Sequence, residues 1–210
     1  MKLKRILSVI ITAAMMLQSV VIATAAEEQQ KQGDLSNSLY KIRNGEEFTI
    51  AYYGGSITYG AGSTDEKNGY AHRVQKAIEE KYGREGLSFS KSFNAAISGT
   101  GTRYGTYRAD LDLWLGTDKT PDLIFIEYAI NDLYEQIGVT GAKKYMESIV
   151  RKCYKANPNM DIIIIYTTDR DVLDGENRYE NAHRAVAAHY VSTITMLSIM
   201  NDMNVVLGKY

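Results

Sequence analysis

The sequence predicts an α/β protein built around a parallel sheet of five strands. Short apolar runs alternate along the chain with longer amphipathic stretches, which is typical of strands joined by crossover helices. Three of the runs are nearly continuous in Ile, Phe and Tyr, as expected for strands covered on both faces. We expect strands at Phe48–Tyr53, Ser88–Phe93, Leu123–Glu127, Ile162–Thr167 and Ser192–Leu197.

Helical spacing is found between these strands. The stretch Ala71–Tyr82 places Val74, Ala77 and Ile78 on one face. The stretch Ala142–Lys155 is stopped by Pro158. Right-handed crossovers would distribute the helices over both faces of the sheet. We expect helices at Ala71–Tyr82, Tyr104–Trp114, Ala142–Lys155 and Glu176–Tyr190.

The first 26 residues have the composition of a secretory leader. Lys2, Lys4 and Arg5 precede an apolar run from Ile6 to Ala26, and Ala23-Thr24-Ala25 fits a cleavage site. An uncleaved N-terminal anchor is the alternative, because the run is nearly long enough to span a bilayer. We therefore predict a signal peptide over 1–26, a loose polar lead-in over 27–44 and one domain over 45–210.

Composition excludes several classes of function. The leader carries three basic residues and no acid, so its removal changes the net charge from −1 to −4. No basic stripe suggests nucleic-acid binding. Cys153 is the only cysteine, which excludes an internal disulfide. Its helical context predicts a small buried hydrophobic residue rather than a catalytic thiol.

Three polar segments follow predicted strands. Gly54-Gly55-Ser56 follows the first strand, Asn94–Gly99 the second, and Ala129-Ile130-Asn131-Asp132 the third. The carboxyl ends of parallel strands meet at one edge of the sheet, where open α/β sheets keep their active sites. Each segment offers a group suited to acyl transfer, namely a hydroxyl, a backbone N–H or a side-chain amide.

Taken in this order, the segments resemble blocks I to III of the SGNH/GDSL hydrolase superfamily. Gly55 stands where that family has Asp, and Ala129 where it has Gly. The resemblance covers roughly Phe48 to the C-terminus and implies a three-layer α/β/α, flavodoxin-like fold. It also implies that Ser56 is the nucleophile and that Gly99 and Asn131 stabilise the oxyanion, without a metal or a cofactor.

Each of these three residues also has an ordinary structural interpretation. Ser56 could cap the helix that follows it, Gly99 could serve a turn, and Asn131 or Asp132 could cap a helix. The occurrence of all three blocks in the family's order favours the catalytic interpretation of Ser56, Gly99 and Asn131.

The family's fourth block, Asp-x-x-His, occurs nowhere in the 210 residues. The chain ends about where that block is expected, which predicts a truncated family member without its general base. His72, His183 and His189 are the only histidines, and we expect them to be structural or solvent-facing.

The predicted function is that of a secreted serine esterase. Its substrate would be a small ester or an acylated extracellular polysaccharide, with acetyl as the acyl group, and no stable membrane insertion is expected after leader removal. Tyrosines near the three blocks predict either sheet packing or a sugar-stacking cleft, and loop residues Arg103, Asp169 and Arg170 are candidates for substrate contact.

Two other functions remain open at this point. A domain without a base could be catalytically inactive and bind carbohydrate or a partner protein. The segment Gly60–Thr64 suggests a phosphate binder, although it lacks the Lys of a P-loop. The sequence fixes neither the exact ester nor the oligomeric state.

Overall fold

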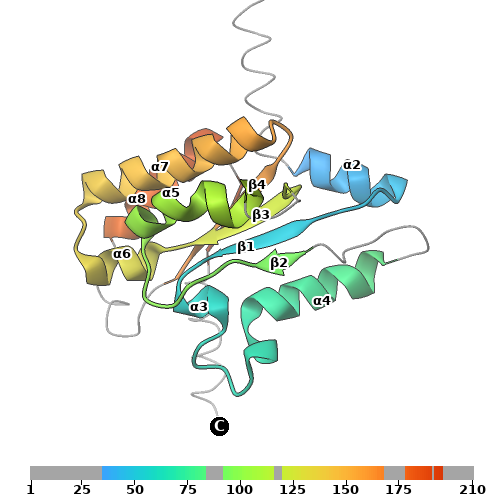
Figure 1. Cartoon of the computed structure of the whole chain (residues 1–210), viewed down its shortest axis with the longest axis horizontal. Coiled ribbons are helices and arrows are strands. Elements are labelled where there is room, and N and C mark those ends of the chain that lie inside the picture. The colour runs from blue at the N-terminus through green and yellow to red at the C-terminus, as the bar shows by residue number, and fades with distance from the viewer. Residues whose placement is uncertain (1–34, 84–91, 116–119, 168–177, 191, 196–210) are drawn as a thin grey trace, which may run out of the picture.

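A computed structural model describes residues 35–83, 92–115, 120–167, 178–190 and 192–195 of the chain (Figure 1). Its sheet has the strand order β2-β1-β3-β4-β5, and every neighbouring pair runs parallel. This order is the one found in flavodoxin-like doubly wound sheets. The predicted α/β class and parallel sheet are confirmed. The strands are β1 (Ile50–Gly54), β2 (Phe93–Asn94), β3 (Leu123–Glu127), β4 (Asp161–Tyr166) and β5 (Ser192–Thr195).

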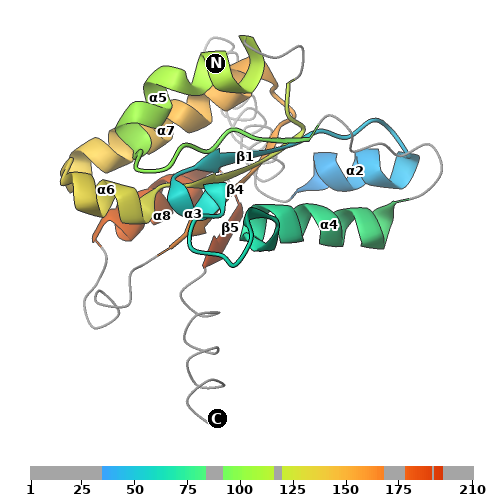
Figure 2. The ribbon, with the colours of Figure 1, turned by 60° about the horizontal axis from the view of Figure 1, so that its bottom comes forward.

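Helices cover both faces of this sheet. Figure 2 shows α2 and α4 on one side of β1, and α5 and α7 on the other. The helices are α2 (Ser36–Asn44), α3 (Ser56–Tyr59), α4 (Tyr70–Tyr82), α5 (Thr102–Asp110), α6 (Ala129–Glu135), α7 (Val139–Ala156) and α8 (Arg178–Tyr190), with a 3₁₀ turn η1 (Glu66–Asn68) and a π-helical turn η2 (Leu111–Leu115).

The alternation of side chains along the strands divides the interior into two cores. On β3, Ile124 and Ile126 enter a core shared with α5, α7 and α8, whereas Leu123 and Phe125 enter a second core with α2 and α4. All five residues of β1 and of β3 are buried. The continuous apolar character of these runs therefore reflects burial on both faces.

The lead-in predicted to be loose over 27–44 is wrong for its second half, because Ser36–Asn44 forms α2. Ile42 is buried in the second core, and the α2 backbone is anchored to the sheet by Asp161 at the start of β4. The Asp161 carboxylate accepts hydrogen bonds from the Ser38 N–H at 2.7 Å and from the Asn37 amide at 3.3 Å. The burial of Ile42 and the hydrogen bond from Ser38 to Asp161 thus stabilise a helix despite the polar composition of this segment.

Other boundaries also differ from those predicted. The second strand covers only Phe93–Asn94, and most of the range predicted for it lies outside the described residues. The helix expected at Tyr104–Trp114 begins two residues earlier and passes into η2. A helix that was not predicted, α6, contains the third motif. β5 covers Ser192–Thr195, and the remainder of that predicted strand is not described.

Cys153 is a buried residue of α7, which confirms the prediction. Burial, with a smaller contribution from the Asp110 carboxylate, raises the pKa of its thiol to about 12. The predicted leader over 1–26 lies outside the described residues. Among the helices that are described, none is both long enough and apolar enough to cross a membrane.

Replacing Asp161 by Ala should detach α2 from the sheet. The buried Ser38 N–H would lose its acceptor, and the free energy of unfolding should fall by about 1–3 kcal/mol. Urea unfolding of both proteins measures the difference. Glu80→Ala, at an exposed position of α4, is the control and should change stability little. Equal stability of Asp161→Ala and the parent protein would contradict the anchoring role.

Candidate active site

Ser56 lies at a tight junction between β1 and α3. A Cβ on Gly54 would lie 2.5 Å from the Glu127 carbonyl oxygen and still closer to the Thr58 hydroxyl, so only glycine fits there. Ser56 is the first residue of α3, and Gly55 is its N-cap. The capping alternative for Ser56 is therefore wrong. Its side chain is partly exposed, and among the described residues no hydrogen bond engages its hydroxyl.

Asn131 lies in α6, the helix that follows β3, and its side chain lies against Gly55, the residue before Ser56. A Cβ on Gly55 would be 2.7 Å from both Oδ1 and Nδ2 of Asn131. The Asn131 side chain is 8% exposed, so its amide faces the junction rather than bulk solvent. Asn131 lies within the first turn of α6, whose N-cap is Tyr128. The structure thus brings Ser56 and Asn131 to one place.

Gly99 belongs to a segment that is hydrogen bonded to the same junction. The Ile97 N–H donates to the Gly54 carbonyl at 3.0 Å, and the Asn94 amide donates to the Thr58 carbonyl at 2.8 Å. Gly99 has φ +77°, a conformation that favours glycine, and a Cβ there would meet no atom within 4 Å. Its backbone conformation, rather than crowding by the protein, therefore accounts for the glycine.

A shallow cavity of about 430 Å³ opens beside Gly99. Arg103, Tyr104 and Tyr107 line it, together with Glu135, which is 3.7 Å from the Arg103 guanidinium. Arg103, expected on a loop, lies in the first turn of α5, and its contact with substrate stays a prediction. The other two residues of that prediction, Asp169 and Arg170, lie outside the described residues.

Some tyrosines near the motifs are buried in the core, and others are exposed to solvent. Tyr53 and Tyr128 are fully buried and meet edge to face, with ring centroids 5.5 Å apart. Tyr59, Tyr104 and Tyr107 are 46%, 49% and 74% exposed. Sheet packing explains the first pair, and only the exposed group has faces available to a ligand.

Asp132, next to Asn131, is a buried carboxylate whose partners sequence reasoning did not identify. Asp132 accepts hydrogen bonds from the Thr102 N–H at 2.7 Å, the Thr102 hydroxyl at 2.8 Å and His183 Nε2 at 2.8 Å. Asp132, Thr102 and His183 are fully buried. Since α5 begins at Thr102, three residues after Gly99, Asp132 fixes the start of that helix relative to Asn131.

The histidines are placed largely as predicted. His183 is a buried partner of Asp132 and so has a structural role. His189 packs edge to face on Tyr190 in the last turn of α8, and His72 is exposed on α4. Within the described residues no histidine is hydrogen bonded to Ser56. The described residues also contain no cluster of three metal-ligating side chains.

Glu127 is a second buried carboxylate, at the end of β3. It accepts hydrogen bonds from the Thr58 hydroxyl at 3.0 Å and the Thr167 hydroxyl at 2.5 Å. The carboxyl thereby joins α3, two residues after Ser56, to the end of β4. Burial raises the pKa of Glu127, although hydrogen bonds from Thr167 and Thr58 oppose that shift. An acidic residue ending an apolar strand was the sequence signal that could have identified it.

The buried Glu127 predicts a pH-dependent stability. The pKa of Glu127 is raised in the folded protein. The contribution of its carboxyl group to the free energy of unfolding is therefore complete below the unfolded-state pKa of 4.5, and it is lost as the pH rises through the folded-state pKa. The side chain of Glu127→Gln stays neutral at every pH, so this variant does not lose stability in that way. Urea unfolding between pH 4 and 8 should therefore show the parent protein losing stability relative to the variant as the pH rises. A constant difference would contradict the raised pKa.

Gly55→Ala should disturb the site, because its new Cβ would overlap the Asn131 amide. We expect a loss of about 1–3 kcal/mol in the free energy of unfolding and a changed NMR signal for the Asn131 side-chain amide. Gly141→Ala, a change within α7, is the matched control, because its Cβ would meet only ordinary contacts of 3.8–3.9 Å with Tyr145 and Ile137. That variant should be stabilised slightly. Equal behaviour of the two variants would refute the close contact.

Comparison with known proteins identifies the family. The sequence profile of the GDSL-like Lipase/Acylhydrolase family matches residues 52–202. No curated protein sequence gives a match. Among solved structures, a two-domain esterase (CEX) active on acetylated mannans is 26% identical, with a TM-score of 0.69 over 85% of this chain and 46% of its own. The same esterase co-crystallised with mannopentaose gives 27% identity and a TM-score of 0.68, over 85% of this chain and 47% of that one.

This chain therefore spans about half the length of CEX. AlinE4, an SGNH-hydrolase family esterase, is 20% identical with a TM-score of 0.59, over 71% of this chain and 76% of its own, and shares the fold. The family profile covers well over half of the 210 residues. The chain therefore belongs to the GDSL-like lipase/acylhydrolase family.

Proposed function

We propose that this protein is a serine esterase whose nucleophile is Ser56. The observation that carries the proposal is the convergence of three motifs on one junction. The Asn131 amide lies against Gly55, and the segment that leads to Gly99 is hydrogen bonded to Gly54. The Ser56 hydroxyl, which no hydrogen bond from the described part of the chain engages, thus lies beside a side-chain amide that can donate to an oxyanion.

In the proposed reaction the Ser56 oxygen attacks the ester carbonyl and forms a tetrahedral intermediate. The N–H groups of Ser56 and Gly99 and the amide of Asn131 donate hydrogen bonds to its oxyanion. Collapse releases the alcohol and leaves an acyl group on Ser56, which water then removes. The buried Asp132 would hold the start of α5, and with it the Gly99 segment, relative to Asn131.

The Ser56 proton needs an acceptor during the attack. The family's Asp-x-x-His motif does not occur in the sequence, and His183 is already engaged with Asp132. We propose that the general base is missing from the described site. Added imidazole, a small base, would then replace it in part.

The proposed substrate is an acetylated polysaccharide outside the cell. Two features support this choice, namely the similarity to an esterase active on acetylated mannans and the leader-like composition of residues 1–26. Acetylated mannan oligosaccharides are accordingly the first substrates to test. A catalytically inactive carbohydrate- or protein-binding domain is the second candidate, favoured by the lack of a histidine hydrogen bonded to Ser56 among the described residues.

Ser56→Ala and Asn131→Ala should separate these two functions. We expect hydrolysis of p-nitrophenyl acetate and of acetylated mannopentaose by the full chain, enhanced by imidazole, to disappear in Ser56→Ala. In Asn131→Ala the rate should fall about 100- to 1000-fold, because one oxyanion donor is lost. Initial rates with and without imidazole measure both effects.

Subtraction of the Ser56→Ala rate removes the hydrolysis that imidazole itself catalyses. Glu80→Gln, an exposed change on α4, serves as a control and should retain the parent rate. If the folded parent protein and Ser56→Ala hydrolyse both esters equally at every imidazole concentration, the esterase assignment fails and the binding domain is favoured.

A further inference from the structure

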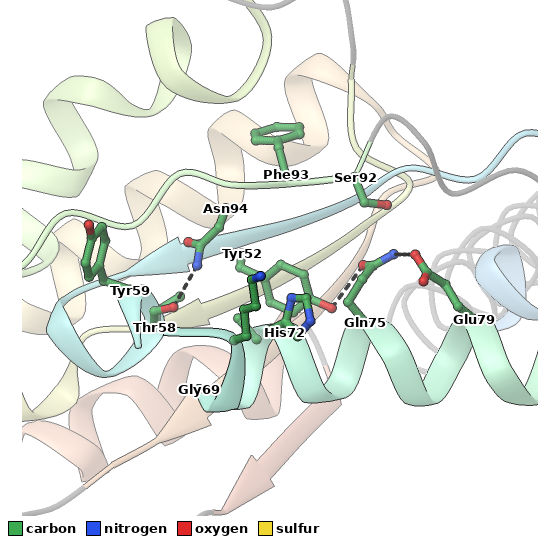
Figure 3. Close-up of a pocket in the computed structure, with 12 residues that line it drawn as sticks. Tyr52, Thr58, Tyr59, Gly69, His72, Gln75, Glu79, Ser92, Phe93 and Asn94 are labelled. Carbon is green, nitrogen blue, oxygen red and sulfur yellow. Dashed lines mark hydrogen bonds between the residues drawn. The ribbon is translucent and has the colours of Figure 1, made fainter. Parts of the chain in front are cut away.

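A cavity of about 560 Å³ lies between α4 and the edge strand β2, on the side of the sheet that α4 covers. Figure 3 shows it extending from Thr58 and Tyr59 at one end, along α4, to Glu79 and Ser92 at the other. Its volume is within the range of small-molecule sites. We call it the α4 groove and define it by Tyr59, His72, Gln75, Glu79, Ser92 and Asn94.

The lining of the groove is polar, which excludes a hydrocarbon chain as its ligand. Of the twelve lining residues that the structure describes, nine carry a side-chain hydroxyl, amide, imidazole, ammonium or carboxyl group. An acyl chain would remove these groups from water without replacing their hydrogen bonds. Within the described lining, Lys67 and Glu79 supply one charge of each sign, so these side chains favour neither an anion nor a cation. A neutral ligand rich in hydroxyl groups fits this lining.

Part of this polar surface is held in place by hydrogen bonds within the protein. The Tyr52 hydroxyl donates to Gln75 Oε1 at 3.2 Å, and Gln75 Nε2 donates to Glu79 Oε1 at 2.7 Å (Figure 3). Tyr52 is itself fixed by stacking on Phe125, with ring centroids 5.1 Å apart. Among the described residues, no hydrogen bond engages the second Gln75 amide hydrogen or Glu79 Oε2, and both can serve a ligand. Such preorganisation lowers the entropy cost of binding.

Tyr59 supplies an aromatic face at the other end of the groove. Its side chain is 46% exposed, and Figure 3 places it beside Thr58 and Asn94. A sugar ring has both an apolar C–H face and hydroxyl groups, so it can cover the Tyr59 ring and bind the polar side chains together. The aromatic face and the amides thus favour a sugar over a smaller polyol.

The groove lies next to the candidate active site along α3. This helix begins at Ser56 and contributes Thr58 and Tyr59 to the groove, and Asn94 is bonded to the Thr58 carbonyl. We propose that the α4 groove binds the unreacted sugar units of an oligosaccharide whose ester group lies at Ser56. This inference rests on the proposed function and adds the path of the substrate across the protein.

Binding of unacetylated oligosaccharides tests the groove separately from catalysis. We would titrate the full chain with mannopentaose and with cellopentaose by calorimetry, using the parent protein, Tyr59→Ala, Glu79→Gln and Glu80→Gln. At least one of the two sugars should bind to the parent protein. Its Kd should rise about tenfold in Tyr59→Ala and about three- to tenfold in Glu79→Gln.

Glu80→Gln is a close control, because it makes the same chemical change one residue further along α4, at a position outside the groove. It should leave the Kd unchanged. Failure of both sugars to bind to the folded parent protein, or equal binding by all four proteins, would overturn the inference. Groove-dependent binding without Ser56-dependent hydrolysis would refute the esterase alone, and hydrolysis with unaltered binding in the variants would refute the groove alone.

Discussion

The close contact between the Gly55 backbone and the Asn131 side chain determines how the rest of the site can be arranged. A Cβ at position 55 would lie 2.7 Å from two atoms of the Asn131 amide, so any side chain there would force that amide to move. The contact holds the third motif directly against the residue before Ser56. The glycine that replaces the family's aspartate is therefore part of the site's geometry.

Two buried carboxylates on the β3–α6 segment extend this arrangement to its neighbours. Glu127 binds Thr58 of α3 and Thr167 at the end of β4, and Asp132 binds Thr102 of α5 and His183 of α8. Burying carboxyl groups is unfavourable unless each oxygen has a hydrogen-bond partner, and both residues meet this condition. One segment thus fixes the mutual positions of four others at the carboxyl edge of the sheet.

The sequence predicted the sheet better than the helix boundaries, for a physical reason. Buried parallel strands such as β1 and β3 are apolar along their whole length, so they are visible as continuous runs. Helix α2 was missed because its local composition is polar and its stability comes from Asp161, more than a hundred residues away. The motif residues could be selected by order and spacing. The roles of Asp132 and Glu127 could not, since they depend on partners brought together only by folding.

Cys153 has a practical consequence for the chemistry of the chain. It is the only thiol in the sequence, and it is fully buried between α7 and the sheet with a pKa of about 12. A protonated thiol with no access to solvent is a poor nucleophile, so the native protein should resist both alkylation and crosslinking of two chains in oxidising surroundings. Any modification of this sulfur first requires opening of the larger core, which makes the residue an intrinsic reporter of core opening.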